Sequence, residues 1–598
     1  EDKGLDEFLK WGPTLLNDFN EIDRYLINSK DLFRNLADIK DIENWSFNSE
    51  KLTPAQERFM AFWDMLPAYY EAFQKFIKEK EVFYSGAAYR YFAENIDLAF
   101  SNNSSAHFLF AGFNALSKAE ISIMQQLEKM GRADIYIEAD SFYMDSKIHE
   151  AGLFLRKLKN TFSITRTGFI ANHFREGKKE INVINCAQSS GQAKVMATIL
   201  KENISKEDEA DTLLLLANEQ LVLPVIKNIP KSISKANITL GLPLKYTPLK
   251  TWLEILFQTQ EGYEQFKKNN TYYKHFLKLI KHPFLVNYLT PEETNALKEV
   301  ENNILAQNWV FVYWQQLKLS DRLTKLFEYI FTPWENNWAL AIQNIRKINE
   351  QLFNAYTDNV QEIEKAIIYQ FDQSLIPMEG LIDTYKPVIS LKTFKQLFNQ
   401  HWSIQTLAYY GNPLDGLQVM GLLETRLLNF KKMIVVGLND GSLPPDNPIQ
   451  TIIPMDLRKY HGMPTTREKQ GLFAHHFYRL LHQVEDCWIT YSSAETGKGM
   501  DEPSRYIHQI KLELAAQFDN ISFKEHLYTI GDEQQSNKPL LVAKNDLLIK
   551  RIDEYLAKGT SASALKGFMR CPLDFYYRYL LGFGEEDSVE EDIEASTF

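Results

Sequence analysis

Hydrophobic residues recur at steps of three and four through the first hundred residues, as on one face of a helix. Gly12-Pro13 interrupts this pattern, and aromatic residues become dense over residues 59–92. An apolar stripe of this spacing is typical of a surface that packs against other helices. We therefore predict a helical N-terminal segment whose aromatic stripe is a packing face and not a base-stacking platform.

From residue 107 the pattern changes to short apolar runs that alternate with helical stretches. The stretch 118–130 opens with Ser117 and Glu120, and 466–483 opens with Thr465 and Glu468, both at capping-box spacing. Alternating strands and helices are typical of parallel sheets. Strands are predicted at 107–111, 135–138, 181–185, 212–216, 417–421, 433–436 and 487–491, and further helices at 191–202 and 219–228.

A long helical block separates two groups of predicted strands, so we interpret it as an insertion within an α/β domain. A last apolar stripe spans 561–583, with Ser563 and Gly582 as expected caps and Pro572 as an expected break. The predicted segments are a first lobe with a helical insertion (1–180), a second lobe in two parts (181–260 and 401–520) around the insertion (261–400), and a linker leading into another domain (521–598).

Composition narrows the class of protein. The 598 residues are too many for one core, and no apolar run is long enough to span a membrane. Cys186, Cys487 and Cys571 lie far apart, which favours a reducing cytoplasm over a disulfide framework. The net charge of −12 lowers the expectation of extensive DNA coating but leaves room for local basic patches. The opening Glu1-Asp2-Lys3, without an initiator Met, indicates a fragment.

Residues 417–444 (LQVMGLLETRLLNFKKMIVVGLNDGSLP) hold two apolar runs, each followed by a loop. Buried parallel strands bring such loops to one edge, where ligands usually bind. This stretch resembles motif V of superfamily 1 helicases, in the form carried by AddB-type and RecB-type helicase–nucleases. Further blocks resemble AddB-like subunits of the diverged PD-(D/E)XK type, in the same order along the chain, at 107–120, 139–152, 237–249, 502–510 and 561–583.

The resemblance implies an α/β fold with two RecA-like lobes of the P-loop NTPase, superfamily 1 helicase-like type. Each lobe would be a parallel sheet, with large helical insertions. In such helicases the motif V loop contacts the DNA backbone. The resemblance therefore makes Thr425, Arg426 and Asn439 candidate DNA contacts.

The departures from an active helicase concern the chemistry of ATP hydrolysis. That reaction needs a glycine-rich loop ending in Lys-Ser/Thr and an acidic pair that holds Mg²⁺. The chain has no such loop, and its Walker B-like strand HFLFAGF carries Ala111 and Gly112 where the carboxylates belong. His482 aligns with the arginine finger, with Arg479 one turn away. We therefore predict a degenerate Walker B site and a helicase shape without ATPase activity.

The end of the chain resembles the entry to a RecB-type nuclease domain. A PD-(D/E)XK core holds Mg²⁺ with acidic residues and a lysine, and we expect that core to lie beyond this chain. Cys571, in Arg570-Cys571-Pro572, matches the first cysteine of the iron–sulfur staple of AddB-like nucleases. A 4Fe–4S cluster needs four thiolates, so Cys571 is a metal ligand only if three further cysteines follow. No cofactor is expected in the fragment itself.

Two basic–aromatic stretches, 157–179 and 266–282, are weaker candidates for DNA contact. Cations bind phosphates and aromatic rings stack on bases, although a solvated amphipathic face is the simpler interpretation. In the second stretch we single out Lys267, Lys274 and Lys278.

Two groups of possible metal ligands are given ordinary roles. Glu138, Asp140 and Asp145 are interpreted as fold-defining acids. His475, His476 and His482 lack the i, i+4 spacing of a zinc helix and are interpreted as surface or packing residues.

The favoured hypothesis is an ATPase-dead, helicase-like DNA-binding portion of a DNA repair exonuclease subunit that acts in double-strand-break end resection. By resemblance its partners would be single-stranded DNA or duplex ends and an AddA-like motor subunit. Two alternatives remain open: an active superfamily 1 DNA helicase whose phosphate loop preceded this segment, and a non-catalytic protein-interaction scaffold. For the fragment we predict no complete active site.

Overall fold

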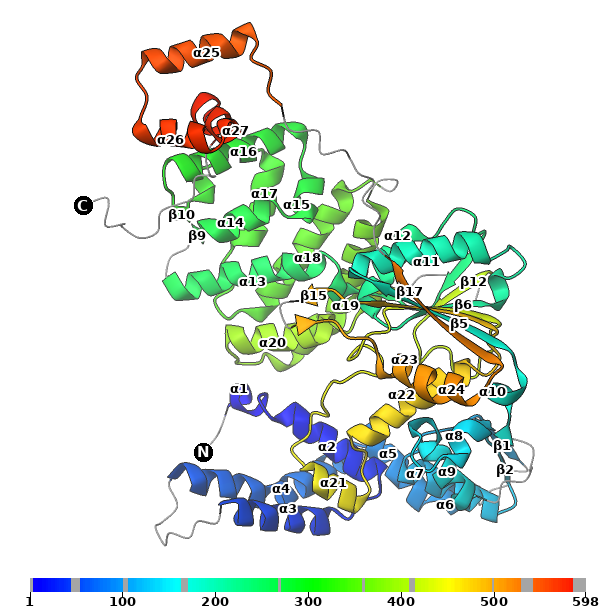
Figure 1. Ribbon diagram of the computed structural model, residues 1–598. Helices are drawn as coiled ribbons and strands as arrows, with labels where there is room; N and C mark the ends of the chain where they lie inside the picture. The colour runs from blue at the N-terminus through cyan, green and yellow to red at the C-terminus, as the bar shows by residue number, and fades with distance from the viewer. Residues whose placement is uncertain are drawn as a thin grey trace. The chain divides into compact units, whose positions relative to one another are not determined.

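A computed structural model shows the chain as two compact units (Figure 1). It describes residues 4–44, 54–100, 106–162, 170–266, 270–357, 361–407, 415–496, 499–528 and 541–583. The first unit comprises Glu1–Leu242 and Ala408–Thr529, and the second comprises Pro243–Leu407 and Ile530–Phe598. The helical insertion predicted over 261–400 thus corresponds to a unit that begins at Pro243 and returns at Leu407.

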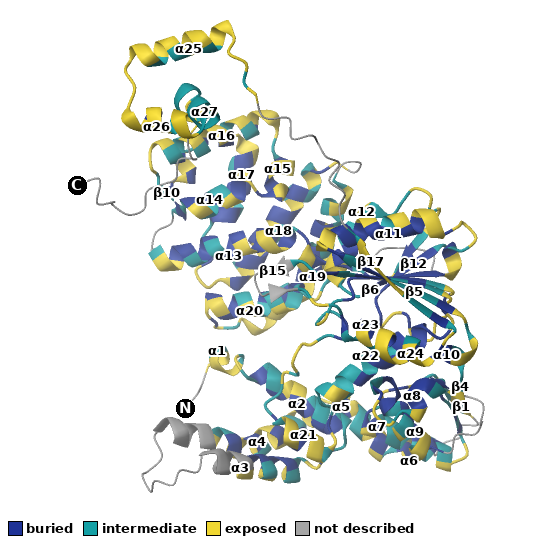
Figure 2. Cartoon of the chain, in the orientation of Figure 1, coloured by how far each residue is buried: buried dark blue, intermediate teal, exposed yellow. Residues whose placement is uncertain are grey.

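A seven-stranded sheet, parallel throughout, forms the centre of the first unit. Its spatial order is β17-β5-β14-β13-β6-β12-β7. The strands are β5 (Lys179–Cys186), β6 (Thr212–Leu216), β7 (Ala236–Ile238), β12 (Leu417–Met420), β13 (Lys432–Val436), β14 (Asp486–Ser492) and β17 (Ile521–Tyr528). β6 and β12 are buried along their whole length, and Figure 2 shows β5, β6 and β12 largely in dark blue. Burial on both faces explains why β6 is an almost continuous apolar run.

Helices cover both faces of this sheet (Figure 1). One face carries α11 (Ser189–Asn203) and α12 (Val222–Asn228), and the other carries α22 (Thr466–Leu480) and α23 (Arg505–Gln509). Alternate residues of the strands pack with α22 and α23 in one hydrophobic core. In this core the rings of Phe477 and Tyr506 stack with their centres 4.9 Å apart. Short segments complete this region, namely β15 (Glu495–Thr496), β16 (Gly499–Met500) and α24 (Ala515–Gln517).

The residues before the large sheet form smaller pieces of α/β structure. β1 pairs with β2 and β3 pairs with β4, both in parallel. The elements are β1 (Phe108–Ala111), α7 (Lys118–Lys129), β2 (Ala133–Tyr136), β3 (Ala139–Asp140), α8 (Ser141–Asp145), α9 (Leu153–Thr161), β4 (Ile170–Ala171) and α10 (His173–Glu176). The mixed α/β fold with a parallel sheet is confirmed. Two complete RecA-like lobes stay a prediction, because the described part of residues 106–178 forms only these paired strands.

The N-terminal helices have a core of their own. They are α1 (Leu5–Phe8), α2 (Gly12–Arg24), α3 (Ser29–Asn44), α4 (Pro54–Glu79), α5 (Ser85–Glu94) and α6 (Ile96–Phe100). Trp63, Leu66 and Tyr70 of the aromatic stripe are buried in this core, so the predicted packing face is confirmed. The core also includes Leu457 of α21 (Met455–His461). The fully buried Arg458 of α21 fixes this contact through Glu21, at 2.5 Å.

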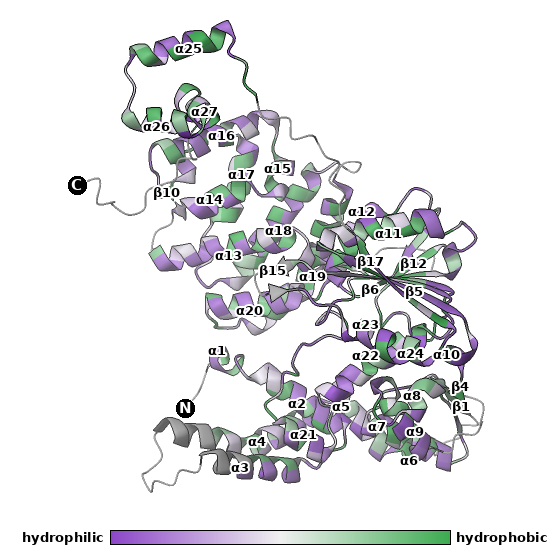
Figure 3. Ribbon diagram, viewed as in Figure 1, coloured by the Kyte–Doolittle hydropathy of each residue, from purple (hydrophilic) through white to green (hydrophobic). Residues whose placement is uncertain are grey.

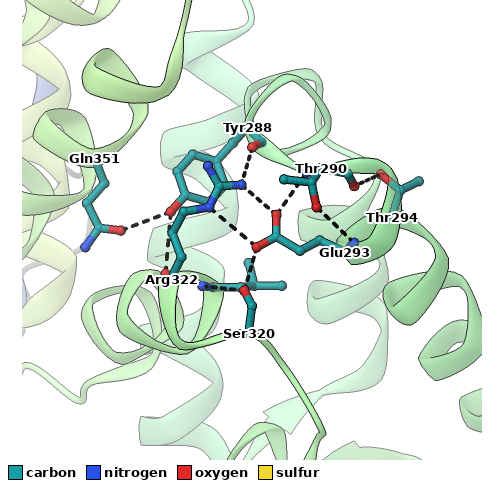
Figure 4. Close-up of polar contacts among 8 residues, drawn as sticks. Tyr288, Thr290, Glu293, Thr294, Ser320, Arg322 and Gln351 are labelled. Carbon is teal, nitrogen blue, oxygen red and sulfur yellow. Dashed lines mark hydrogen bonds and ion pairs between the residues drawn. The ribbon is translucent and has the colours of Figure 1, made fainter.

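The second unit is helical apart from short strand pairs. Its elements are β8 (Leu242–Pro243, at the boundary), α13 (Leu249–Phe266), β9 (Thr271–Tyr272), α14 (Tyr273–Ile280), α15 (Pro283–Tyr288), α16 (Pro291–Ala306), β10 (Phe311–Val312), α17 (Asp321–Phe331), α18 (Trp338–Ala355), α19 (Glu362–Tyr385), α20 (Leu391–Trp402) and β11 (Thr406–Leu407). Glu293 closes a capping box with Thr290 at the start of α16, and also accepts hydrogen bonds from Ser320 and Arg322 at the start of α17 (Figure 4). One buried carboxylate therefore joins two helix starts.

The C-terminal helices are α25 (Asp546–Ala557), α26 (Ala562–Arg570) and α27 (Pro572–Phe575). The break predicted at Pro572 is confirmed, because Cys571 is extended and α27 begins at the proline. The cap prediction was wrong by two residues: Ser561, not Ser563, accepts the hydrogen bond from the Ala564 amide. Both apolar and polar residues lie along α25 (Figure 3), and it contains no buried residue.

Residues 521–528 differ from their assignment as linker, because they form β17 at the edge of the sheet. The first three residues of β17 are buried or half-buried, and the next four are exposed. The segment therefore lacks the apolar run that marks the central strands. No helix in the described ranges has the length and hydropathy needed to cross a membrane.

Candidate nucleic-acid interface

The loop that follows β12 contains two of the predicted DNA contacts, and their environments differ. The Thr425 side chain is 1% exposed, and its hydroxyl donates to the Leu422 carbonyl at 2.7 Å. Arg426 is exposed, and within the described ranges it forms no hydrogen bond or ion pair. Arg426 can therefore reach a phosphate, whereas Thr425 stabilises the loop.

Asn439, in the loop after β13, is held by backbone groups. Its amide nitrogen donates to the carbonyls of Ser492 at 2.7 Å and Glu502 at 3.0 Å. Its amide oxygen accepts from the Ser492 amide at 3.0 Å. The side chain thus ties this loop to the end of β14. Its role in DNA binding stays a prediction.

The degenerate Walker B positions lie at the end of β1, against the loop after β12. Gly112 has φ +73°, and a Cβ built on it would lie 2.4 Å from the Leu427 side chain. An aliphatic side chain therefore occupies the space into which residue 112 would project. Alanine and glycine supply no oxygen ligand, so these positions do not fit Mg²⁺.

Arg479, the alternative to His482 as an arginine finger, is used internally. The side chain is 5% exposed and contacts both oxygens of Glu138, with Nη2 3.0 Å from Oε2 and 3.3 Å from Oε1. It also donates to the Leu428 carbonyl. The guanidinium therefore joins α22 to the β2–β3 connection and to the loop that carries Arg426. A side chain held in this way stabilises the fold and is not positioned as an arginine finger.

His482 lies in a group that the sequence did not bring together. The nearest ring nitrogens of His173 and His482 and a carboxylate oxygen of Glu138 all lie within 4.8 Å of one another. The two imidazole rings stack at 4.8 Å, and the Tyr143 ring lies nearly parallel to the His482 ring, with the ring centres 5.9 Å apart. The His482 side chain is 0% exposed, so its prediction as a packing residue is confirmed. It also lies beside two other possible metal ligands, Glu138 and His173.

The charges around this group are paired. The pKa of Glu138 is lowered to about 2. The largest cause is the His482 imidazole, and the Arg479 guanidinium adds to it, whereas burial acts in the opposite direction. Burial lowers the pKa of His482. Lys179 donates to the carbonyls of His482 and Val484, both at 2.9 Å, and burial lowers its pKa to about 8.

Asp140 has the fold-defining role predicted for it. One carboxylate oxygen accepts from the Phe142 amide at 2.9 Å, and the other accepts from the His173 amide at 2.6 Å. This second bond sets the start of α10 and so the position of His173. No sequence pattern predicted this group, because Glu138, His173 and His482 come from three segments that only the fold brings together.

The basic candidates are divided between the two units. Lys274 and Lys278 are exposed on α14 of the second unit, where Lys274 lies 5.8 Å from the Tyr272 ring centre. Lys267 lies outside the described residues. In the stretch 157–179, Lys179 is buried, and Arg156, directly before that stretch, donates to the Tyr143 carbonyl at 2.5 Å. That stretch is therefore partly internal.

The cysteines do not fit an iron–sulfur cluster within this chain. Cys571 is partly buried, whereas Cys186 and Cys487 are buried in β5 and β14 of the other unit. Burial raises the pKa of Cys487 to about 12, which disfavours the thiolate that metals bind. Three cysteines in two units cannot supply four thiolates to one cluster.

Comparison with family models and with curated proteins found no match to this chain.

Proposed function

We propose that this chain is a helicase-like DNA-binding portion, without ATPase activity, of a subunit of an AddB-like DNA repair exonuclease that acts in double-strand-break end resection. It would work in the cytoplasm, on single strands or duplex ends, with an AddA-like motor subunit. The intact protein would use Mg²⁺, and a 4Fe–4S cluster if three further cysteines join Cys571.

One observation carries the DNA-binding part of this proposal. Arg426 is an exposed cation in the connection from β12 to β13, and among the described residues it has no carboxylate partner. A cation of this kind is suited to binding phosphate. The resemblance of residues 417–444 to motif V supports the same assignment.

The absence of ATPase activity is supported independently. Residues 111 and 112 carry no carboxylate, Leu427 fills the space beside Gly112, and Arg479 is engaged by Glu138. Among the alternatives, a live motor would need an acidic pair elsewhere. A protein-interaction scaffold agrees with the net charge of −12 and remains the second candidate.

The test is a salt titration of DNA binding. We expect the chain to bind a labelled single strand or a tailed duplex, with an observed affinity that falls linearly on a log–log plot against salt. Arg426→Ala should weaken binding about threefold to tenfold at low salt and flatten the slope by about 1. Anisotropy of the labelled DNA measures both quantities.

Lys206→Ala is the matched control. Lys206 is an exposed cation in a different connection, the one that enters β6. Removing it changes the net charge by the same amount, so an equal loss of affinity would reflect charge alone. Absence of binding at low salt would favour the scaffold, and an Arg426→Ala variant that binds like wild type would remove the proposed contact.

A further inference from the structure

The geometry points to a Zn²⁺ site formed by Glu138, His173 and His482, with a fourth coordination position open to solvent. This site is independent of the proposed DNA-binding function. Two imidazole nitrogens and one carboxylate oxygen are a donor set that Zn²⁺ takes when it keeps a water ligand. All three residues belong to the first unit.

The free donor atom of His482 is the strongest sign of a ligand. Its Nδ1 is buried and has no hydrogen-bond partner among the described residues, and it lies 3.7 Å from Oε1 of Glu138, too far for a hydrogen bond. A buried nitrogen without a partner destabilises the fold. A cation between Nδ1 and Oε1 would satisfy the nitrogen.

Neighbouring groups hold the three donors in the manner of a second coordination shell. Nε2 of His482 lies 3.2 Å from the Tyr143 hydroxyl, a contact that fixes the orientation of the ring. Arg479 holds Oε2 of Glu138 more closely than Oε1. Asp140 fixes the backbone of His173.

Zn²⁺ would require only a small closure of the group. Donors about 2.1 Å from a tetrahedral Zn²⁺ lie about 3.4 Å from one another, somewhat closer than the 4.8 Å limit within which these atoms fall. Glu138 and His173 are the partly exposed members, and His482 is the buried one. Arg479 and Lys179 add positive charge nearby, and Glu138 and Asp140 offset it.

Solvent reaches the group through a cavity of about 570 Å³ lined by both histidines, by Glu176 and by residues 483–486. This cavity gives the ion an entry path and room for a water ligand. Because two donors are imidazoles, binding requires them to be neutral.

The test uses the full chain, freed of metal with a chelator, and Zn²⁺ alone as the probe. We expect one equivalent to bind in competition with a chromogenic chelator, and Co²⁺ in its place to give the visible absorption of a tetrahedral nitrogen–oxygen site. His173→Ala should weaken binding more than about tenfold and leave the melting temperature of the metal-free protein unchanged.

His508→Ala is the control, because His508 is an exposed histidine of the same unit, outside the group. It should bind Zn²⁺ like wild type. The proposal is overturned if wild type binds no stoichiometric Zn²⁺, if His173→Ala binds as tightly as wild type, or if His508→Ala loses as much affinity. Added Zn²⁺ should also raise the melting temperature of wild type but not of His173→Ala.

Discussion

At the scale of single residues, the contact between the β2–β3 connection and α22 is stabilised by one carboxylate, that of Glu138. Glu138 is the countercharge of Arg479, whose side chain is 5% exposed and has only one other partner among the described residues, the Leu428 carbonyl. A buried cation that loses its countercharge destabilises the fold more than the intact pair stabilises it. Glu138 is itself 36% exposed, which moderates the effect.

We expect Glu138→Gln to lower the free energy of unfolding by about 1–3 kcal/mol at neutral pH. The pKa of Glu138 is about 2 in the folded chain, below the ordinary 4.5. Its contribution is therefore complete above pH 4.5 and decreases as the pH falls toward 2. Urea unfolding of both proteins at several pH values measures the difference. A difference that grew on acidification would contradict this assignment.

At the scale of elements, the packing of β1 against the loop after β12 explains why position 112 is glycine. Its positive φ and the Leu427 side chain both exclude a Cβ. The sequence pattern predicts β1 as a strand, and it shows that residues 111 and 112 lack carboxylates. It could not show what fills their place, because Leu427 is 315 residues away in the chain.

We expect Gly112→Ala to destabilise the chain by about 1–2 kcal/mol from its backbone conformation alone, with a further cost from contact with Leu427. In the Gly112→Ala variant, adding Leu427→Ala should remove the cost of the side-chain contact but not the cost of the backbone conformation. The two changes together should therefore cost less than the sum of the single variants, which a double-mutant cycle of unfolding free energies measures. Strict additivity would mean that the two side chains do not interact.

Elements with strong local signals were predicted closely. β6 has the predicted bounds, and the capping boxes at Ser117 and Thr465 are both present. β7, with three residues, and β17, an edge strand, were missed because neither has a long apolar run. The Glu138, His173 and His482 group was missed for another reason: only tertiary packing brings its members together.

At the scale of the whole molecule, the proposal separates binding from catalysis. We expect the purified chain to hydrolyse no ATP with Mg²⁺, with or without DNA, because residues 111 and 112 cannot hold the ion. We also expect no degradation of DNA with Mg²⁺ or Mn²⁺. Phosphate release and gel analysis of labelled DNA measure the two activities. DNA-stimulated ATP hydrolysis by the chain alone would favour the live-motor alternative.

The order of strands in the large sheet bears on how the protein is made. β5, β6 and β7 are synthesised first, yet none pairs with another: each has only neighbours from residue 417 onward. During synthesis these strands remain unpaired while the 178 residues between Ile238 and Leu417 (residues 239–416) are added, which takes on the order of 10–40 s. We expect the helical unit to fold during that interval, and the emerging apolar strands to need a chaperone until their partners arrive.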